Sequence, residues 1–250
     1  MLLAPLEIRK QRSREIVRRH YHDKGWRSPY ARYRDEIVSE LSPGQAVLDV
    51  GCGRTFPEAK FLMAAGARAY GLDPVADASA VPEGAVVRKG GAESIPFESE
   101  MFDVVISCAV LEHLQQPEEV FAELQRVLKP GGRVVFLTPA KYDYVSVLAR
   151  IIPNALHGKL VKATEGRDEA DTFPTFYRAN TIRQIRRLAS TAGLSPAKLT
   201  YVNQFPYALS FSPLLCRLGI LYDAVVTRVR CLHWLQAWLL GVLRKGRADR

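Results

Sequence analysis

The chain has little cysteine, and its cysteines do not form a pattern. Its 250 residues contain four, and none has the C-x-x-C or C-x₂₋₄-C spacing of a metal or disulfide framework: Cys52, Cys108, Cys216 and Cys231. This spacing argues against a zinc site, and we predict no metal. The opening "MLLAPLEIRKQRSREIVRRH" also lacks the long apolar core of a signal peptide. We therefore expect a protein of the reducing cytoplasm.

Phosphate-binding glycine motifs are missing as well. No G-x-x-x-x-G-K-[ST] string occurs, and in "VLDVGCGRTFP" (residues 47–57) Phe56 stands where a dinucleotide turn needs a third small residue. Asp49 lies two residues before Gly51, and a carboxylate at this point repels a diphosphate but attracts an ammonium group. The turn therefore favours a ligand that carries a cation.

The net charge of +9 is concentrated at the ends of the chain. Residues 1–40 contain ten Lys/Arg against six Asp/Glu, residues 217–250 contain seven against two, and residues 41–216 contain eighteen of each. Basic ends beside a neutral middle favour a surface contact at the termini, with solvated helix faces as the alternative.

Short Val/Ile/Leu-rich runs alternate with helical patterns from residue 45 to about 200. The predicted strands are 46–50, 67–72, 85–88, 102–107 and 133–137, and the predicted helices are 57–65, 117–128 and 181–192. This alternation predicts an α/β fold with a doubly wound, mostly parallel, Rossmann-like sheet and helices on both faces.

The chain divides by composition into three parts. Residues 1–40 are predicted to be a basic helical segment, residues 41–205 a ligand-binding domain, and residues 206–250 a helical extension that is apolar and then basic. Within the domain, residues 140–180 form a long insertion that we expect to cover the site, because insertions at the carboxyl edge of such sheets do so.

The glycine turn itself predicts an amino-acid ligand. Thr55 and Glu58 match an S/T-x-x-E capping box, which would replace the missing third glycine. Gly51 and Gly53 allow close approach of a ligand, and free N–H groups at the helix start would receive its carboxylate while Asp49 attracts its ammonium. In "YGLDP", Asp73 ends the next strand, where a carboxylate accepts ribose hydroxyls. An amino acid joined to a ribose is the outline of S-adenosylmethionine.

Five motifs in order carry a family resemblance: "VLDVGCG", "YGLDP", "GGAESIPF", "FDVVISCAVLEHL" and "ELQRVLKPGGRVVFLTP". With them the sequence resembles the class I S-adenosylmethionine-dependent methyltransferases, in particular the branch with the type-11 methyltransferase domain. The resemblance covers about residues 45–140 and extends more weakly over 173–196.

The resemblance implies a role for each motif. Asp49, Gly51, Cys52 and Gly53 would hold the methionine end, and Asp73 the ribose. The family usually has an Asp before the Ala-Glu pair for the adenine amino group; this chain has Gly91, which leaves Ala92 and Glu93 as candidates. Ser107 and Cys108 would border the transferable methyl. Asp103 opens its strand at the far end from the ligand, and we assign it a structural role.

Three residues are candidates for catalysis. His113, in "LEHL", could act as a base, but we favour a packed histidine that shapes the site. His157 and Asp171, in the insertion, are the other possible bases. Methyl transfer from a sulfonium is a single in-line displacement, so positioning supplies much of the rate, and only an oxygen nucleophile also needs a base.

The predicted function is methyl transfer to a small-molecule, glycan or lipid-linked acceptor. One alternative is an RNA methyltransferase, which is disfavoured because the sequence has no RNA-binding motif and its charge does not cluster near the site. The other is a non-catalytic cofactor-binding or scaffold protein with the same fold, suggested by Thr55 and Gly91. The acceptor atom and the oligomeric state are not predicted.

The segment "CLHWLQAWLLGVLRKGRADR" has no charge between residues 231 and 243. Thirteen helical residues would span about 20 Å, too few to cross a bilayer. We predict a helix with a narrow polar stripe of His233, Gln236 and Arg244, with Trp234 and Trp238 one turn apart and four basic residues at its end, Arg244, Lys245, Arg247 and Arg250. Such a helix fits the headgroup layer of an anionic membrane on the cytoplasmic face. Docking on the protein's own sheet or on a second subunit is the other interpretation.

Overall fold

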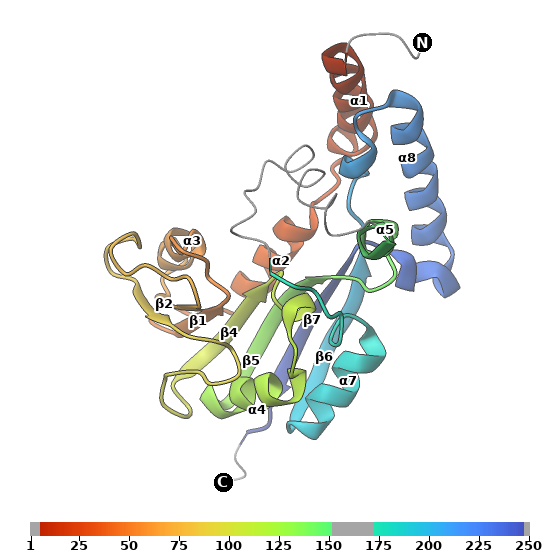
Figure 1. The fold of residues 1–250 in the computed structure, drawn as a ribbon. Helices are drawn as coiled ribbons and strands as arrows, with labels where there is room; N and C mark the ends of the chain where they lie inside the picture. Colours follow the sequence, from red (N-terminus) through yellow and green to blue (C-terminus); the bar gives the residue numbers. More distant parts are fainter. Residues whose placement is uncertain (1–5, 152–172, 248–250) are drawn as a thin grey trace. The chain divides into compact units, whose positions relative to one another are not determined.

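The computed structural model describes residues 6–151 and 173–247, which form two compact units (Figure 1). The sheet unit comprises Tyr33–Pro139, Pro174–Thr200 and Leu239–Arg250, and the helical unit comprises Met1–Arg32, Ala140–Phe173 and Tyr201–Trp238, each within the described residues. Three elements continue from one unit into the other along the chain: α2 (Pro29–Val38), β6 (Leu194–Val202) and β7 (Trp238–Lys245).

The sheet unit is built on a seven-stranded sheet of order β3-β2-β1-β4-β5-β7-β6. Its first five strands in sequence are β1 (Ala46–Val50), β2 (Arg68–Asp73), β3 (Val86–Lys89), β4 (Phe102–Cys108) and β5 (Leu128–Pro139). These five pair in parallel, with β1 between β2 and β4. All five residues of β1 are buried, because a central parallel strand has both faces covered.

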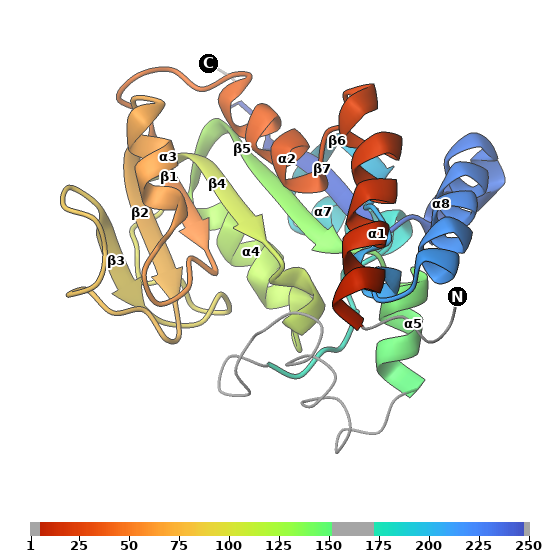
Figure 2. The same cartoon turned by 90° about the horizontal axis from the view of Figure 1, so that it is seen from above.

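Helices cover both faces of this sheet, as the alternating pattern predicts (Figure 2). The helix α3 (Glu58–Ala64) packs on β2, while α4 (Pro117–Val127) packs on β5 and contacts α7 (Ile182–Thr191). Thr181 caps α7, its side chain accepting a hydrogen bond from the Gln184 amide at 3.2 Å. The short η2 (Leu111–His113) follows β4. The predicted fold class is therefore confirmed, and so are the five predicted strands. Four of them agree to within one residue at each end, whereas β5 begins five residues before its predicted start.

The two strands that the sequence did not predict are β6 and β7, and β7 corrects the predicted C-terminal helix. Residues 238–245 are a strand between β5 and β6, and residues 239–243 are buried. A side chain at Gly241 would meet the ring of Phe136, at 2.2 Å from its Cβ position. The segment is apolar all round because both faces of a central strand are covered, and the prediction of a helix lying in a membrane at this place is wrong.

The two basic residues that end this strand also have partners within the sheet unit. Arg244 forms an ion pair with Glu40, and the Lys245 ammonium donates to the Leu128 carbonyl at 2.8 Å. They are thus part of the packing of the sheet rather than a cationic tail. In the described part of the chain, none of the helices combines the length and the apolar character that a membrane span requires.

The predicted capping box of α3 is also wrong. The N-cap residue is Pro57, which has no side-chain hydrogen bond, and Thr55 is exposed. Phe56 has a left-handed φ of 47° that turns its ring into the core, where it is fully buried. Glu58 instead forms a bidentate ion pair with Arg34, whose guanidinium donates to the two carboxylate oxygens at 2.7 and 3.1 Å.

The helical unit contains α1 (Leu6–His20), α5 (Tyr144–Ile151) and α8 (Pro213–Arg228), with the short turns η1 (His22–Lys24), η4 (Tyr207–Leu209) and η5 (Arg230–Leu235). Val17 and Tyr21 of the α1 end pack with Cys216 of α8 in a small core. The Tyr21 hydroxyl donates to the buried Asp223 carboxylate at 2.5 Å. The helical prediction for residues 1–40 is confirmed for α1 and α2.

Candidate cofactor site

Three neighbouring strands bring the predicted cofactor residues to one edge of the sheet. Asp49 is the next-to-last residue of β1, Asp73 is the last of β2, and Cys108 is the last of β4. Because β1 pairs in parallel with both β2 and β4, their carboxyl ends lie together. Most of the residues that the sequence assigned to a cofactor therefore gather at the edge where α/β folds bind ligands.

Asp49 is a buried acid without a counter-charge among the groups that act on it. Its side chain is only 4% exposed, and its pKa is raised from 3.8 to about 8. Burial is the main cause, followed by the negative charges of Glu58 and Asp73. A protein does not gain stability by burying a carboxyl group in this way, so the arrangement favours a role in binding a cationic group.

The glycine turn needs glycine for the protein's own packing. Gly51 has a φ of 87°, and a Cβ atom there would lie 2.1 Å from a methyl carbon of Val110. Gly53 has a φ of 69° but has no atom within 4 Å of its Cβ position. Val110, which no sequence motif singles out, therefore forms the wall opposite the turn.

The amide groups of this turn are already paired within the chain. The Gly51 and Cys52 amides donate to the Leu72 carbonyl at 2.8 and 3.2 Å, and the Gly53 amide donates to Asp73 at 2.8 Å. The Cys52 thiol packs inward, 2.7 Å from the Cβ position at Gly71, and burial raises its pKa to about 12. The turn therefore offers a close backbone surface rather than a set of free donors.

Asp73 has a second task that the sequence did not reveal. One carboxylate oxygen accepts the Gly53 amide at 2.8 Å and the other accepts the Val75 amide at 2.9 Å. Each oxygen of a carboxylate has a further lone pair, so both can also accept a ribose hydroxyl. Asp73 thus holds the glycine turn in place and presents an acceptor pair at the strand end.

The position where the family usually has an Asp lies beside Glu93. A Cβ atom added to Gly91 would be 2.8 Å from a carboxylate oxygen of Glu93. Glu93 is exposed, and Ala92 between them is half-buried. The structure therefore brings a carboxylate from two residues further along the chain to the place that Gly91 leaves open.

Two buried hydroxyl groups at the end of β4 have no hydrogen-bond partner among the described residues. They are the Ser107 hydroxyl and the Tyr33 hydroxyl, the latter from the part of α2 in the sheet unit. Burial raises the Tyr33 pKa, and the charges of Asp49 and Cys108 raise it further, so the three groups lie near one another. The Ser107 backbone lowers that pKa slightly, but it does not reach hydrogen-bond geometry with the phenol. Burial likewise raises the Cys108 pKa.

The sequence does not mark Tyr33 as a site residue, because its spacing is that of a core residue. It lies four residues before the buried Ile37, which is the pattern of the apolar face of a helix. The only available signal was its phenolic hydroxyl, since a buried tyrosine usually finds a partner.

His113 is fixed by the segment that follows the insertion. Its Nδ1 lies 2.9 Å from the Pro174 carbonyl, which can only accept, so Nδ1 carries the proton. The neighbouring Glu112 is more deeply buried, and its carboxylate accepts from Thr138 at 3.0 Å, while Asn180 donates to Thr138 at 2.7 Å. This geometry fits a packed histidine that shapes the site, and the buried Glu112, which the sequence does not mark, organises the motif.

The remaining predicted residues lie away from this edge or outside the described chain. Asp103 accepts from the Ala46 amide at 2.9 Å and the Lys129 ammonium at 2.8 Å, at the opposite end of β4, which agrees with its structural assignment. His157 and Asp171 lie outside the described residues. Among the described residues, no group of three metal-ligating side chains occurs.

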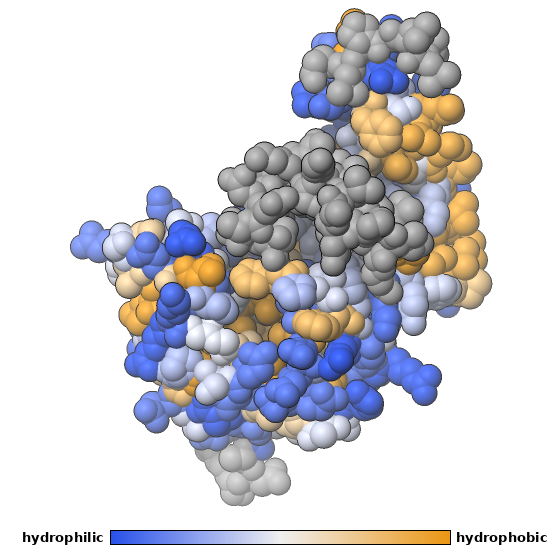
Figure 3. All heavy atoms as spheres, viewed as in Figure 1, coloured by the Kyte–Doolittle hydropathy of each residue, from blue (hydrophilic) through white to orange (hydrophobic). Residues whose placement is uncertain are grey.

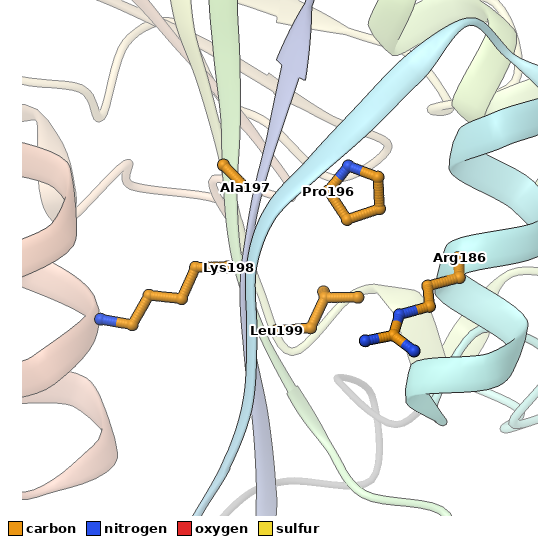
Figure 4. A pocket seen from close by; sticks show the side chains of 5 residues that line it. All are labelled: Arg186, Pro196, Ala197, Lys198 and Leu199. Atoms are coloured by element: carbon orange, nitrogen blue, oxygen red, sulfur yellow. The ribbon is translucent and has the colours of Figure 1, made fainter.

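A separate hollow of about 380 Å³ lies between β6 and α7 (Figure 4). It is lined by Arg186, Lys198, Leu199, Pro196 and Ala197, and none of these is a predicted site residue. It is shallow and open, and lacks the carboxylates that an ammonium or a ribose needs. We therefore place the site by its chemistry at the ends of β1, β2 and β4.

Comparison with known proteins identifies relatives of the chain. A family model described as "Methyltransferase domain" matches residues 48–136. A tRNA U34 carboxymethyltransferase of Methylococcus capsulatus is 35% identical over 125 residues, which cover 46% of this chain and only 39% of that protein. A ubiquinone biosynthesis O-methyltransferase of Ralstonia nicotianae is 30% identical over 192 residues, which cover 73% of this chain and 74% of that protein.

The fold is shared with solved methyltransferases. One of them is the crystal structure of geranyl diphosphate C-methyltransferase from Streptomyces coelicolor in complex with S-adenosyl-L-homocysteine. It matches with a TM-score of 0.56 at 16% identity, over 86% of this chain and 75% of that one. The uncompensated Asp49, the turn at Gly51 and the acceptor pair of Asp73 fit a ligand that joins an amino acid to a ribose. The chain belongs to the class I S-adenosylmethionine-dependent methyltransferases, and S-adenosylmethionine is its cofactor.

Proposed function

We propose that the protein transfers the methyl group to a small organic acceptor, glycans and lipid-linked molecules included. The observation that carries the proposal is the charge of the cofactor edge. The negative charges of Glu58 and Asp73 act on Asp49 there, and Glu93 and Glu112 lie in the segments that follow β3 and β4. An edge with this many carboxylates suits a neutral or cationic acceptor and repels a polyanion.

Within this proposal, S-adenosylmethionine supplies an electrophilic methyl group on a sulfonium. Asp49 holds the ammonium of the amino-acid end, and Asp73 accepts the ribose hydroxyls while it keeps the glycine turn closed. Glu93 accepts the adenine amino group in place of the Asp that Gly91 replaces. The buried hydroxyls of Ser107 and Tyr33 are unsatisfied groups that a bound ligand would complete.

His113 and Glu112 position the wall of the site rather than move a proton. The ring of His113 is held through Nδ1 to Pro174, and the buried Glu112 carboxylate is held by Thr138. A methyl transfer in which the chain mainly orients its reactants needs such fixed walls, since orientation alone can contribute roughly 7–11 kcal/mol. Should the acceptor be a hydroxyl, the base would be His157 or Asp171.

The alternative of a nucleic-acid acceptor has one comparison in its favour, the tRNA-modifying relative, but that match covers less than half of either chain. A polyanionic acceptor normally meets a basic surface at its binding site. The acidic edge argues against this, and salt dependence distinguishes the two cases, because binding to RNA weakens steeply with salt.

The proposal is tested by turnover with labelled cofactor. The intact chain and its Asp49→Asn variant are incubated with phenols, alcohols and amines, and separately with bulk tRNA, and S-adenosylhomocysteine is measured. We expect product with a small acceptor, at a rate that changes little with salt, and none with the variant. Turnover on tRNA alone, or cofactor binding without turnover on any acceptor in cell extracts, would contradict it.

A further inference from the structure

An unusual stripe of apolar side chains lies along the outer face of α8. Leu214, Leu218, Leu221, Val225 and Val229 are 40–62% exposed, and we refer to them as the leucine stripe. They follow one another at intervals of four, three, four and four residues, so they share one face of the helix. Figure 3 shows apolar side chains gathered over this helix.

The opposite face of α8 already has its partners. Cys216, Gly219, Asp223 and Val226 are buried there, and a Cβ atom at Gly219 would lie 2.5 Å from Pro206. The helix is thus docked by one face within its unit, and the leucine stripe is not needed for that docking. Large exposed apolar patches on a folded protein mark interaction surfaces.

The charges beside the leucine stripe are all of one sign. Arg217 and Arg228 each precede a stripe residue by one position, so they lie along one flank, and both are exposed. The only acid of α8 is Asp223, which is buried and accepts the Tyr21 hydroxyl. The outer face of α8 therefore combines apolar side chains with cations and carries no exposed carboxylate.

A basic hollow adjoins this flank. It has a volume of about 350 Å³ and is formed between α1 and α8, lined by Ile16, Ile220, Arg19, His20 and Arg217. Arg19 forms an ion pair with Glu15 of the same helix, and Arg217 lines the hollow from α8. A cation beside an apolar surface suits the phosphate of a lipid headgroup, whose acyl chains would lie against the stripe.

We propose that α8 binds an anionic membrane surface, with the leucine stripe in the headgroup layer and Arg217 and Arg228 beside lipid phosphates. A second copy of the chain is the less suitable occupant, because a twofold contact would place this arginine flank against itself. Five stripe residues are also far fewer than the roughly 20–30 residues on each side of a stable interface. The proposal does not depend on which acceptor is methylated.

Sedimentation of the full chain with vesicles tests the proposal. The vesicles contain either phosphatidylcholine alone or phosphatidylcholine with phosphatidylglycerol. The stripe is altered by Leu221→Glu with Val225→Glu, and the matched control is Val38→Glu with Val86→Glu, two exposed valines of the sheet unit. The flank is altered by Arg217→Gln with Arg228→Gln, and its control is Arg183→Gln with Arg186→Gln in α7, both exposed.

We expect the wild-type chain to pellet with the anionic vesicles at low salt and to remain soluble with the neutral ones. The partitioning of the stripe variant onto the vesicles should be roughly a hundredfold weaker, because two charges replace two apolar side chains that would be buried in the membrane interface. The flank variant should lose about tenfold, and both control variants should behave like the wild type.

Three results would overturn the proposal. The wild-type chain could remain soluble with every vesicle. The flank variant and its α7 control could lose the same amount while the stripe variant keeps its binding, which would indicate unspecific attraction of a basic protein. The stripe variant could also change the oligomeric state in light scattering without lipid, which would make the leucine stripe a contact between copies of the chain.

Discussion

Both units of the protein bury acidic side chains, but the groups around these side chains differ. In the helical unit, Asp223 accepts a hydrogen bond from Tyr21 at 2.5 Å, and Asp143 accepts from the Val145 amide at the start of α5 at 3.0 Å. In the sheet unit, the pKa of Asp49 is affected by burial and by two other carboxylates, those of Glu58 and Asp73. Burial raises the pKa of all three, to about 7 for Asp223, about 6 for Asp143 and about 8 for Asp49.

The difference separates acids that serve the fold from one that serves a ligand. An acid that accepts a hydrogen bond from its own chain costs less to bury, because the bonded oxygen is satisfied. A buried acid whose neighbours carry the same charge destabilises the folded chain unless a cationic group binds beside it. Asp49 therefore marks a binding site, whereas Asp223 marks a structural contact, although both are buried and both have raised pKa values.

The largest effect should come from Asp49→Asn. Removing the charge that meets the cofactor ammonium should weaken binding by about 3 kcal/mol, roughly a hundredfold, as measured by calorimetry. The matched control is Asp103→Asn, at the far end of the sheet, which should lower stability through its contacts to Ala46 and Lys129 and leave the affinity unchanged. Equal affinities for the Asp49 variant and the wild type would remove Asp49 from the site.

Asp49 also makes the stability of the cofactor-free protein depend on pH, and the same variant tests this. The folded pKa of Asp49, about 8, lies above its ordinary 3.8, so the fold favours the neutral form. Its contribution to stability is full below about pH 4 and is lost as the pH rises through 8. Asp49→Asn should therefore make the cofactor-free protein more resistant to heat at pH 8.5 than the wild type.

Cofactor binding should reverse this preference, because the ammonium favours the carboxylate. At pH 6.5 binding should release close to one proton, seen as a dependence of the calorimetric heat on the ionisation enthalpy of the buffer. The Asp49→Asn variant should release none. A wild-type heat that is the same in all buffers would show that Asp49 is already charged or stays neutral.

The next effect concerns Asp73, which accepts hydrogen bonds from its own chain and is also expected to bind the cofactor. Asp73→Asn should weaken cofactor binding by about 1.5–3 kcal/mol and also lower the free energy of unfolding by about 1 kcal/mol, because it disturbs the bond to Gly53 or to Val75. The control is Asp77→Asn, whose carboxylate binds only Ser79 in an exposed turn. A loss of affinity without loss of stability would mean that the turn does not rely on Asp73.

Asp223→Asn should alter stability and leave the cofactor affinity as it is. The folded pKa of about 7 lies above the ordinary value of 3.8, so the stability that the neutral acid contributes is lost between about pH 4 and 7. The variant should make this pH dependence shallower, by about 1–2 kcal/mol across the range, in urea titrations at several pH values. A change in cofactor affinity would blur the distinction between the two units.

The smallest effect is expected at the adenine end. Glu93→Gln should weaken cofactor binding by about 1 kcal/mol, since an exposed hydrogen bond is worth little, and Glu98→Gln serves as the exposed control. Adding Gly91→Asp to Glu93→Gln should restore the affinity, because the family's usual carboxylate then replaces the one from Glu93. If the double variant binds no better than the single one, Glu93 does not take that role.

Gly51 is a poor place for such tests, which only the structure reveals. The sequence suggests that a larger side chain there would simply block the ligand. The neighbouring Val110 methyl would be only 2.1 Å from the added Cβ, so any substitution disturbs the fold before it touches a ligand. Gly53, which has open space around it, is the better position, although its φ of 69° adds strain.

The sequence by itself determined the doubly wound sheet and the acids at its edge. Strand β1 is a short run of five buried residues followed by two glycines, and Asp73 ends the next strand, so local pattern and chain order suffice to bring Asp49 and Asp73 together. Parallel pairing does the rest, because consecutive strands of such a sheet present the same end to the ligand.

Tertiary structure decided what local patterns leave ambiguous. The apolar run at 238–245 is compatible with a buried helix or a buried strand, and only its place between β5 and β6 makes it a strand. Thr55 has the spacing of a cap, but the burial of Phe56 turns the chain away from it. Whether an apolar side chain is core or surface depends on what packs against it, so the residues that looked membrane-facing lie inside the sheet and the leucines of α8 lie outside.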